Sequence, residues 1–192
     1  VFDGTKESYY LEDDRPRPAT TVGRRLLELE RGILKTKARA LILRSGWIFG
    51  REGHGLFDAF LHAINKGHDI PINPDMVGAP TPAPDVARVL FAMMQQLYFG
   101  AEGWGIYHYC CSDVATSRDF VETVVTMATQ YSKVDPASIR LVEVKDAYKT
   151  AIPRHPLLAC NKILNTFGIK QRPWRSAMTS LLRNLYLETE TA

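Results

Sequence analysis

Residues 38–43 have the sequence ARALIL, a short and nearly unbroken apolar run that is followed by a glycine-rich loop. Apolar runs of this length are typical of strands that are buried on both faces of a parallel sheet. A second run of this kind, GIYHYCC, occupies residues 105–111. Segments with apolar residues at helical spacing lie before, between and after these two runs. This alternation predicts an α/β fold with parallel strands.

The helical spacing predicts six helices, each with one apolar face. They are expected over residues 21–32, 56–66, 85–99, 117–132, 161–167 and 174–187. The first helix has Gly32 as a soft stop, and its apolar stripe is expected to pack against the protein. The stripe consists of Val22, Leu26, Leu27, Leu29 and Ile33.

Three further segments have weaker signals. Residues 68–84 contain five prolines, which is too many for a helix or a central strand, so a loop is predicted there. A short strand is expected within residues 138–144. Val1 and Phe2 run straight into an Asp-Gly turn, which indicates the end of a strand.

The composition excludes several classes of protein. A chain of 192 residues with 45% hydrophobic and 10% aromatic residues is globular and has the length of one ordinary domain. The net charge of +3 is too small to indicate a nucleic-acid partner. No apolar run approaches the roughly 18 residues of a membrane helix, and the first residues do not have the pattern expected of a secretory leader. Three cysteines, two of them adjacent, form no disulfide framework, so a cytoplasmic location is expected.

Metal and nucleophile motifs are absent from the sequence. No two histidines share a helix face with a carboxylate at ligand spacing, so no metal site is predicted. Cys110 and Cys111 are adjacent in a predicted strand and point to opposite faces, so they cannot chelate one ion together. The chain contains no Gly-x-Ser-x-Gly elbow and no glycine-rich phosphate loop after a strand.

A series of short fragments follows a recognisable order along the chain. They are Val1-Phe2-Asp3-Gly4; Tyr10-x-Glu12-x-Asp14 with Pro18 and Gly23; Leu43-Arg44-x-x-Trp47-x-Phe49-Gly50; Asp75-x-x-Gly78-x-Pro80-Thr81 with Asp85-x-Ala87; Gly105-Ile106-Tyr107-His108; Asp119-Phe120; and Cys160-x-Lys162-Ile163 with Phe167-Gly168-Ile169 and Trp174-Arg175. In this order they resemble the dTDP-4-dehydrorhamnose reductase (RmlD-like) family of extended short-chain dehydrogenases.

The resemblance implies a Rossmann-type sheet that binds NAD(P)H and a small substrate-binding lobe that holds a nucleotide sugar. In the family, the glycine-rich turn for the cofactor's pyrophosphate precedes the segment that matches Val1–Gly4. Residues 1–192 are therefore expected to form the carboxy-terminal part of an RmlD-like domain, without the dinucleotide-binding half. NAD(P)H is expected as a cofactor of the full-length protein rather than of this chain alone.

The family's catalytic pair is a tyrosine that gives a proton and a lysine four residues later. The resemblance carries these positions to Val22 and Leu26, which can neither donate a proton nor bear a charge. Two interpretations remain open: a shift of the alignment hides a working pair, or the helix has lost the pair and kept only its packing. The continuous apolar stripe favours the second, so no catalytic residue is predicted.

Five residues are predicted to bind the substrate: Arg44, Trp47, Gly78, Thr81 and Arg154. Gly78 would let the backbone approach a ligand closely, and Arg154 would bind a diphosphate with two hydrogen bonds. Arg154 lies within residues 133–183, which contain ten Lys/Arg against three Asp/Glu. The alternatives are a charge at a strand end for Arg44, core packing for Trp47, a simple connection at Thr81 and a solvated surface for Arg154.

Two functions are therefore considered. The first is a nucleotide-sugar-binding protein that resembles NAD(P)H-dependent dTDP-4-dehydrorhamnose reductase, and the substrate-lobe motifs favour it. The second is a non-catalytic regulatory or scaffolding subunit that binds a partner enzyme, a role with a precedent in the regulatory subunit of methionine adenosyltransferase. Val22 and Leu26 favour this second function. The expected partners are a nucleotide sugar and either a second copy or a partner enzyme, with no nucleic acid and no membrane.

Overall fold

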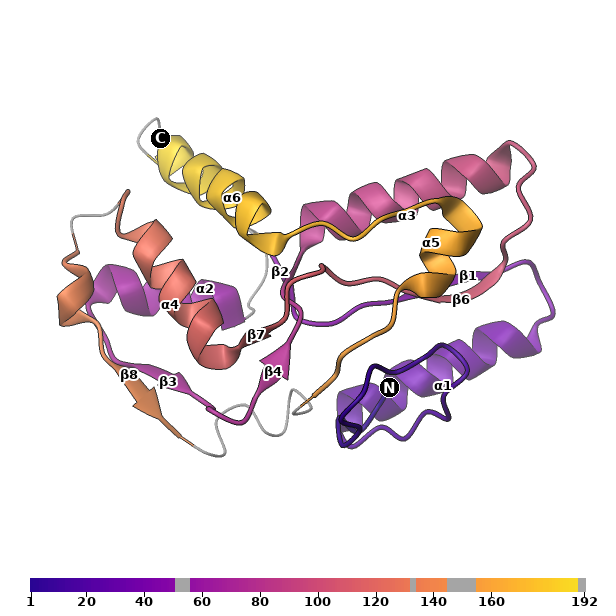
Figure 1. Ribbon diagram of the computed structural model, residues 1–192, viewed down its shortest axis with the longest axis horizontal. Helices are drawn as coiled ribbons and strands as arrows, with labels where there is room; N and C mark the ends of the chain where they lie inside the picture. The colour runs from indigo at the N-terminus through magenta and orange to yellow at the C-terminus, as the bar shows by residue number, and fades with distance from the viewer. Residues whose placement is uncertain (51–55, 132–133, 145–154, 190–192) are drawn as a thin grey trace.

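The computed structural model describes residues 1–50, 56–131, 134–144 and 155–189 (Figure 1). No helix among these residues is long and apolar enough to cross a membrane. In chain order the elements are α1 (Thr21–Lys35), β1 (Leu41–Arg44), β2 (Ile48–Phe49), α2 (Leu56–Lys66), β3 (Ile70–Ile72), β4 (Val77–Gly78), β5 (Thr81–Pro82), α3 (Ala83–Tyr98), β6 (Gly105–His108), β7 (Ala115–Thr116), α4 (Ser117–Ala128), the 3-10 helix η1 (Pro136–Ser138), β8 (Leu141–Glu143), α5 (Asn161–Phe167) and α6 (Trp174–Thr189).

The described strands pair two by two. The two apolar runs form β1 and β6, which pair in parallel from Leu41 opposite Gly105 to Arg44 opposite His108. The β2–β5 and β3–β8 pairs are also parallel, and β4–β7 is antiparallel. The prediction of an α/β fold with parallel strands is confirmed.

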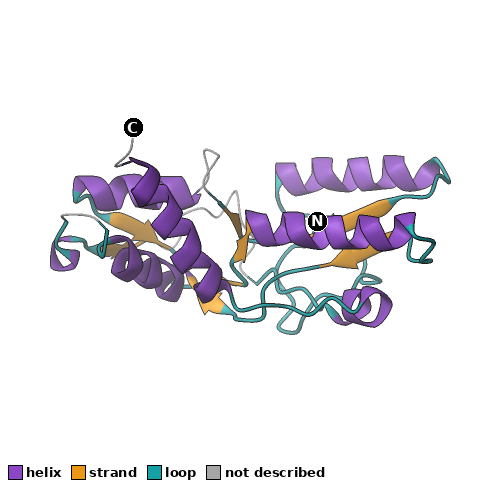
Figure 2. Cartoon of the chain, turned by 90° about the horizontal axis from the view of Figure 1, so that it is seen from above, coloured by secondary structure: helices purple, strands orange, loops and turns teal. Residues whose placement is uncertain are grey.

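The molecule has two halves, each with its own apolar core (Figures 1 and 2). The first half holds α2, α4, α6 and the β3–β8 pair, and its core is centred on aromatic side chains such as Phe120 and the fully buried Trp174. The second half holds the β1–β6 pair between α1 and α3, with α5 beside β6. Its core includes Tyr107, Tyr109 and Ile163.

Local sequence signals fix several helix ends. The Thr116 hydroxyl accepts a hydrogen bond from the backbone N–H of Asp119, and the Asp119 carboxylate accepts one from the backbone N–H of Thr116. This reciprocal cap makes Thr116 the residue that caps the amino-terminal end of α4. Gly67 follows α2 and Gly168 follows α5, both in the left-handed conformation that glycine adopts without strain.

Some predicted boundaries are wrong. α1 continues through Gly32 to Lys35 because a single glycine costs a helix only about 1 kcal/mol. α4 ends at Ala128, four residues before the predicted end. The segment 68–84 is not a plain loop, since it contains β3, β4 and β5. Proline is tolerated there because every strand in a two-stranded sheet is an edge strand. Residues 1 and 2 form no strand.

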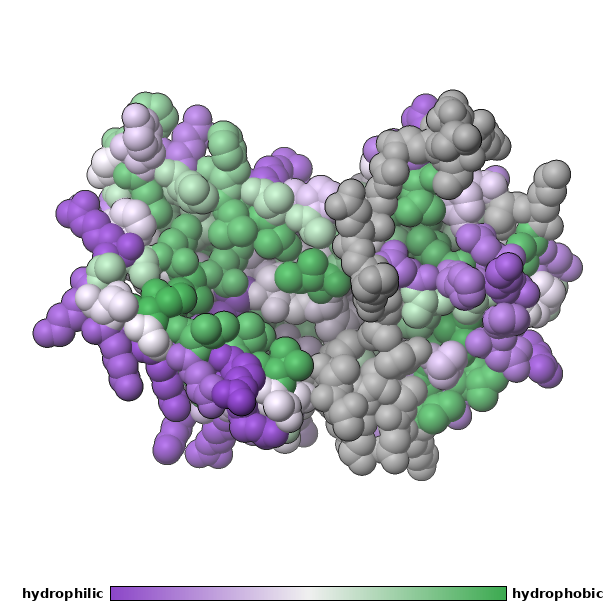
Figure 3. All heavy atoms as spheres, turned by 180° about the vertical axis from the view of Figure 1, so that it is seen from behind, coloured by the Kyte–Doolittle hydropathy of each residue, from purple (hydrophilic) through white to green (hydrophobic). Residues whose placement is uncertain are grey.

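The apolar stripe of α1 does not pack as predicted. Val22, Leu26 and Leu29 are 63%, 49% and 64% exposed. Within the predicted stripe only Leu27 is buried, and the helix buries Gly23 and Glu30 on the same face. The side chain of Pro18 lies against Gly23 at a distance that leaves little room for a larger residue. Apolar side chains accordingly gather on this half of the molecule when it is seen from behind (Figure 3).

Two leucines on α1 provide a matched test of this placement. In this chain we expect Leu27→Ala to lower the free energy of unfolding by about 2–4 kcal/mol, because Leu27 is buried. Leu29→Ala should change it by less than about 0.5 kcal/mol, because that side chain is exposed. Urea unfolding followed by circular dichroism measures both values. Equal losses at the two positions would show that Leu29 is covered in solution.

Candidate functional site: the cavity beside α1

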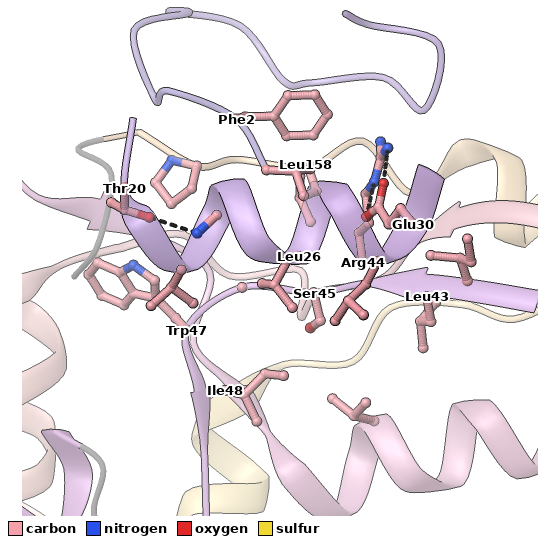
Figure 4. A pocket seen from close by; sticks show the side chains of 18 of the residues that line it. Phe2, Thr20, Leu26, Glu30, Leu43, Arg44, Ser45, Trp47, Ile48 and Leu158 are labelled. Carbon is pink, nitrogen blue, oxygen red and sulfur yellow. Dashed lines mark hydrogen bonds and ion pairs between the residues drawn. The ribbon is translucent and has the colours of Figure 1, made fainter. Parts of the chain in front are cut away.

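A cavity of about 670 Å³ lies between α1, β1, the loop after β1 and α3 (Figure 4). Its walls are largely apolar. α1 contributes Val22, Leu26, Leu29 and Ile33, and α3 contributes Val86 and Leu90. The loop that runs from Arg44 to Ile48 lines the cavity along its whole length. In parallel α/β sheets, ligands bind outside the carboxyl ends of the strands, and this loop leaves the carboxyl end of β1.

A buried ion pair joins β1 to α1 beside the cavity. Arg44 Nε and Nη2 donate to the two carboxylate oxygens of Glu30, at 2.9 and 2.7 Å. The side chains of Arg44 and Glu30 are only 8% and 11% exposed. The Arg44 guanidinium also lies 5.2 Å from the centre of the Phe2 ring and 3.5 Å from the Glu12 carbonyl oxygen. Two-pronged pairing satisfies both charges, which burial requires.

His108 lies fully buried at the end of β6, next to this ion pair. Its Nδ1 is 3.1 Å from the Tyr10 carbonyl oxygen, which can only accept, and its Nε2 is 3.4 Å from Arg44 Nη1, which can only donate. These two partners require a neutral ring with the proton on Nδ1. Burial and the positive charge of Arg44 lower the pKa of His108 to about 4.

Trp47 is the residue with the most constrained backbone in the loop. It has φ of +46°, a left-handed conformation that is costly for a bulky side chain. Its carbonyl oxygen accepts a hydrogen bond of 3.0 Å from the backbone N–H of Thr81. A Cβ atom at Gly78 would lie 2.3 Å from Trp47 Cε2, so only glycine fits beneath the indole. The backbone of Gly78 is thus approached by Trp47.

Two buried polar atoms beside the cavity lack a hydrogen-bond partner among the described residues. They are the hydroxyl oxygen of Ser45 and the indole nitrogen of Trp47, and both residues line the cavity. Buried polar side chains in folded proteins are normally hydrogen-bonded, because an unsatisfied group costs about 1–3 kcal/mol. One donor and one hydroxyl beside the cavity therefore have no hydrogen-bond partner among the described residues.

A second polar cluster fixes the start of α3 to the end of β6. Asp85 accepts hydrogen bonds from the Tyr109 hydroxyl and, at 2.7 Å, from Arg88 Nε. Arg88 Nη2 also lies 3.3 Å from the Tyr109 hydroxyl oxygen. Burial and the Asp85 carboxylate raise the pKa of Tyr109. All three groups use their hydrogen bonds on one another, so the cluster acts as a structural clamp.

The structure places two of the five predicted substrate-binding residues, Arg44 and Trp47, at the cavity. Val22 and Leu26, Arg44 and Trp47 all line the cavity, whereas Gly78 lies behind the Trp47 ring. Thr81 is fully buried, and its hydroxyl donates to the Ala79 carbonyl oxygen at 2.9 Å. Arg154 lies outside the described residues. Among the described residues, no group of three or more His, Cys, Asp or Glu side chains could hold a metal ion.

Sequence reasoning did not find Glu30, His108 and Ser45 as parts of this region. The signal for Glu30 is its position on the same helix face as Gly23 and Leu27. That face is buried, and a buried charge requires a partner. His108 sits inside an apolar run where only a neutral ring fits. Ser45 carries no signal, because its lack of a partner depends on the folded loop.

A sequence profile described as the RmlD substrate binding domain matches residues 1–187. The chain belongs to this family. It is 27% identical to a dTDP-4-dehydrorhamnose reductase of Sinorhizobium fredii over 197 residues, which cover 100% of this chain and 66% of the relative. It is 27% identical to the enzyme of the same name from Aggregatibacter actinomycetemcomitans, over 94% of this chain and 63% of the relative. The chain thus spans just under two thirds of the length of these curated relatives.

Solved structures of the family have the same fold as this RmlD-family chain. A dTDP-4-dehydrorhamnose reductase from Clostridium acetobutylicum superposes with a TM-score of 0.81 at 20% identity, covering 96% of this chain and 62% of that protein. The enzyme from Bacillus anthracis in complex with NADP gives a TM-score of 0.78 at 19% identity, again over 96% and 62%. The resemblance inferred from the ordered fragments is confirmed.

The ion pair of the RmlD-family chain predicts an asymmetric response to mutation. Arg44→Met should lower the free energy of unfolding by about 3–5 kcal/mol, because it leaves the Glu30 charge buried and unpaired. The double variant Arg44→Met/Glu30→Leu should lose less than Arg44→Met alone, since no uncompensated charge remains. Chemical denaturation measures both. Arg25→Met is the control, because its pair with Glu28 is exposed and should contribute under about 1 kcal/mol.

His108 predicts how stability depends on pH. The folded state binds a proton at this ring only near pH 4, whereas the unfolded ring binds one near pH 6.5, so between these values the unfolded state holds more protons. Stability should therefore be complete above pH 6.5 and fall by about 3 kcal/mol as the pH drops to 4. His108→Asn keeps a donor for the Tyr10 carbonyl and should remove this component. The exposed His68→Asn should leave it unchanged, and equal pH profiles for both variants would contradict the assignment.

Proposed function

We propose that this chain binds a sugar nucleotide in the cavity beside α1. The observation that carries the proposal is the pair of polar atoms without a partner among the described residues, Ser45 Oγ and Trp47 Nε1, beside a largely apolar cavity. The cavity lies at the carboxyl end of β1, where ligands of α/β proteins bind. Apolar walls with a few placed polar groups are typical of small-molecule sites. A sugar hydroxyl can accept from the Trp47 indole N–H and exchange hydrogen bonds with the Ser45 hydroxyl.

The ligand class follows from the family. The relatives carry the name dTDP-4-dehydrorhamnose reductase, so a dTDP-linked sugar is the ligand proposed for this chain. Arg154 stays the proposed contact for the diphosphate, because guanidinium binds phosphate oxygens in pairs. Direct contact by Arg44 and Thr81 remains a prediction, and Arg44 also has a positioning role through its ion pair with Glu30.

We further propose that α1 of this chain does not reduce the sugar. Val22 and Leu26 lie one turn apart and both face the cavity, which supports the register given by the family pattern. Neither side chain can protonate a carbonyl oxygen or hold the ribose of NAD(P)H. With Leu29 and Ile33 they make this wall of the cavity apolar, so α1 does not fit the nicotinamide ribose.

The proposed place of this chain is the carboxy-terminal part of an RmlD-type domain. Two features of the fold support it. β1 pairs with β6 along one edge, and no described strand pairs with its other edge. The apolar stripe of α1 is exposed beside that edge. This exposure is expected of a surface that another layer of sheet and helix covers in the complete domain. A dinucleotide-binding half is the proposed cover.

A regulatory or scaffolding subunit is the second candidate, and the same exposed side chains favour it. Large apolar side chains on α3 are also exposed, with Phe91 at 68% and Met94 at 61%. Exposed large apolar side chains of this kind favour contact with another protein or a second copy. The second candidate requires that the chain associates with another protein, and it is compatible with a chain that does not bind a sugar nucleotide. The first candidate requires sugar-nucleotide binding.

Calorimetric titration distinguishes the two candidates. We expect dTDP-glucose to bind the protein, and Trp47→Phe to weaken that binding at least about tenfold, because the variant keeps the ring over Gly78 but removes the N–H donor. Trp104→Phe is the matched control and should bind as the wild type does, since Trp104 precedes β6 at its opposite end.

The contradicting outcomes are also clear. If Trp47→Phe binds dTDP-glucose as tightly as the wild-type protein does, the ligand does not bind in this cavity. If a protein that is folded by circular dichroism binds neither dTDP-glucose nor dTDP, the sugar-nucleotide function is wrong. Leu26 offers the ribose of NADPH no hydrogen bond. Any heat of binding measured when NADPH is titrated alone should therefore be larger for Leu26→Lys than for the wild-type protein.

A further inference from the structure

Two cysteines from distant parts of the chain meet in the core of the half that holds β6. Cys110 follows β6 and Cys160 immediately precedes α5, and their Sγ atoms lie 3.7 Å apart. Both residues are buried, at 3% and 6% exposure. A separation of 3.7 Å is van der Waals contact between sulfur atoms, and a disulfide requires about 2.05 Å. A bond between them therefore requires the two sulfur atoms to move closer by about 1.7 Å.

The surroundings distinguish the two sulfur atoms. Gln171 Nε2 lies 3.7 Å from the Cys110 sulfur and donates to the Cys110 carbonyl oxygen at 2.9 Å. The Leu158 carbonyl oxygen lies 3.6 Å from Cys110 Sγ and 3.7 Å from Cys160 Sγ. The hydrogen bond between the two thiols lowers the pKa of Cys160, and the same bond together with burial raises the pKa of Cys110. The two thiols share one hydrogen bond, so one thiolate is favoured over two, and we take Cys160 as the attacking sulfur.

The third cysteine does not take part. Cys111 points to the other face of the chain, where its Sγ lies 3.9 Å from Asp85 Oδ2. Adjacent residues in an extended segment have opposite side-chain directions, which explains why Cys110 meets Cys160 and Cys111 does not. Cys111 is thus an internal control with the same chemistry and similar burial, at 2% exposure.

We propose that Cys110 and Cys160 form a reversible intramolecular disulfide when the protein meets a peroxide. The Cys160 thiolate attacks one oxygen of hydrogen peroxide, the O–O bond breaks, and a sulfenic acid and hydroxide form, the latter taking up the thiol proton as water. The Cys110 sulfur then attacks the Cys160 sulfur, its proton leaves with the displaced hydroxide as water, and the S–S bond forms. Two thiols and one peroxide give one disulfide and two waters.

The bond would close a loop over residues 111–159, which contain β7, α4 and β8. It would join a residue just after β6 to the residue before α5. These residues lie at the two ends of the segment that enters the half that holds α2, α4 and α6. A cross-link of this kind removes conformations from the unfolded chain and stabilises the folded one. The oxidised protein should therefore unfold at a temperature several degrees higher than the reduced protein.

Peroxide titration of the wild-type protein and of Cys111→Ser tests the proposal. After one equivalent of hydrogen peroxide, both proteins should lose two titratable thiols under denaturing conditions, and peptide mapping should give a single 110–160 disulfide within one chain. Dithiothreitol should restore both thiols and reverse the rise in Tm. Cys160→Ser should form no intramolecular disulfide under the same conditions.

Other outcomes would overturn the proposal. Native protein whose thiols stay intact while the unfolded chain oxidises would show that the buried pair cannot react. A bond that maps to Cys111, bonds between chains, or sulfinic acid at Cys160 in place of a disulfide would each assign the oxidation to different chemistry. Because the first measurements use the wild-type chain, they remain decisive if a variant fails to fold.

Discussion

The buried ion pair between Arg44 and Glu30 determines how the parts around the cavity are held together. It joins the end of β1 to the inner face of α1, and His108 brings β6 into the same network. A charge in this position is tolerated only when its hydrogen-bonding capacity is filled, so the rotation of α1 is fixed by the partner of Glu30 rather than by its apolar side chains. The exposure of Val22 and Leu26 toward the cavity follows from that rotation.

The sequence predicts the parts of the fold whose signals are local. β1 and β6 coincide with the two continuous apolar runs, and α4 begins at Ser117, where the helical spacing predicts it. The short strands β3, β4 and β5 could not be predicted, because two or three residues carry no measurable periodicity. The rotation of α1 could not be predicted either, since the four exposed apolar residues Val22, Leu26, Leu29 and Ile33 outweigh Gly23 and Glu30 in any pattern.

The candidate site divides in the same way. Family fragments led to Arg44, Trp47 and Gly78, because each belongs to a motif with its own spacing. Their actual relations depend on contacts across the fold: Arg44 is engaged by Glu30, and Trp47 covers Gly78. The unpartnered groups of Ser45 and Trp47 are properties of the folded loop, so no sequence pattern could reveal them. In this protein the sequence identifies the loop, and the structure assigns the roles within it.

The contact between Trp47 and Gly78 also constrains how this chain can evolve. Position 78 has no room for even a methyl group while the indole is in place, and the left-handed backbone at position 47 favours small residues if the ring is lost. The two positions are therefore coupled both in side-chain size and in the order of substitution. The side chain at position 47 must become smaller before the one at position 78 can become larger. Divergent members of the family should carry correlated changes at these two positions, with glycine at 78 wherever tryptophan remains at 47.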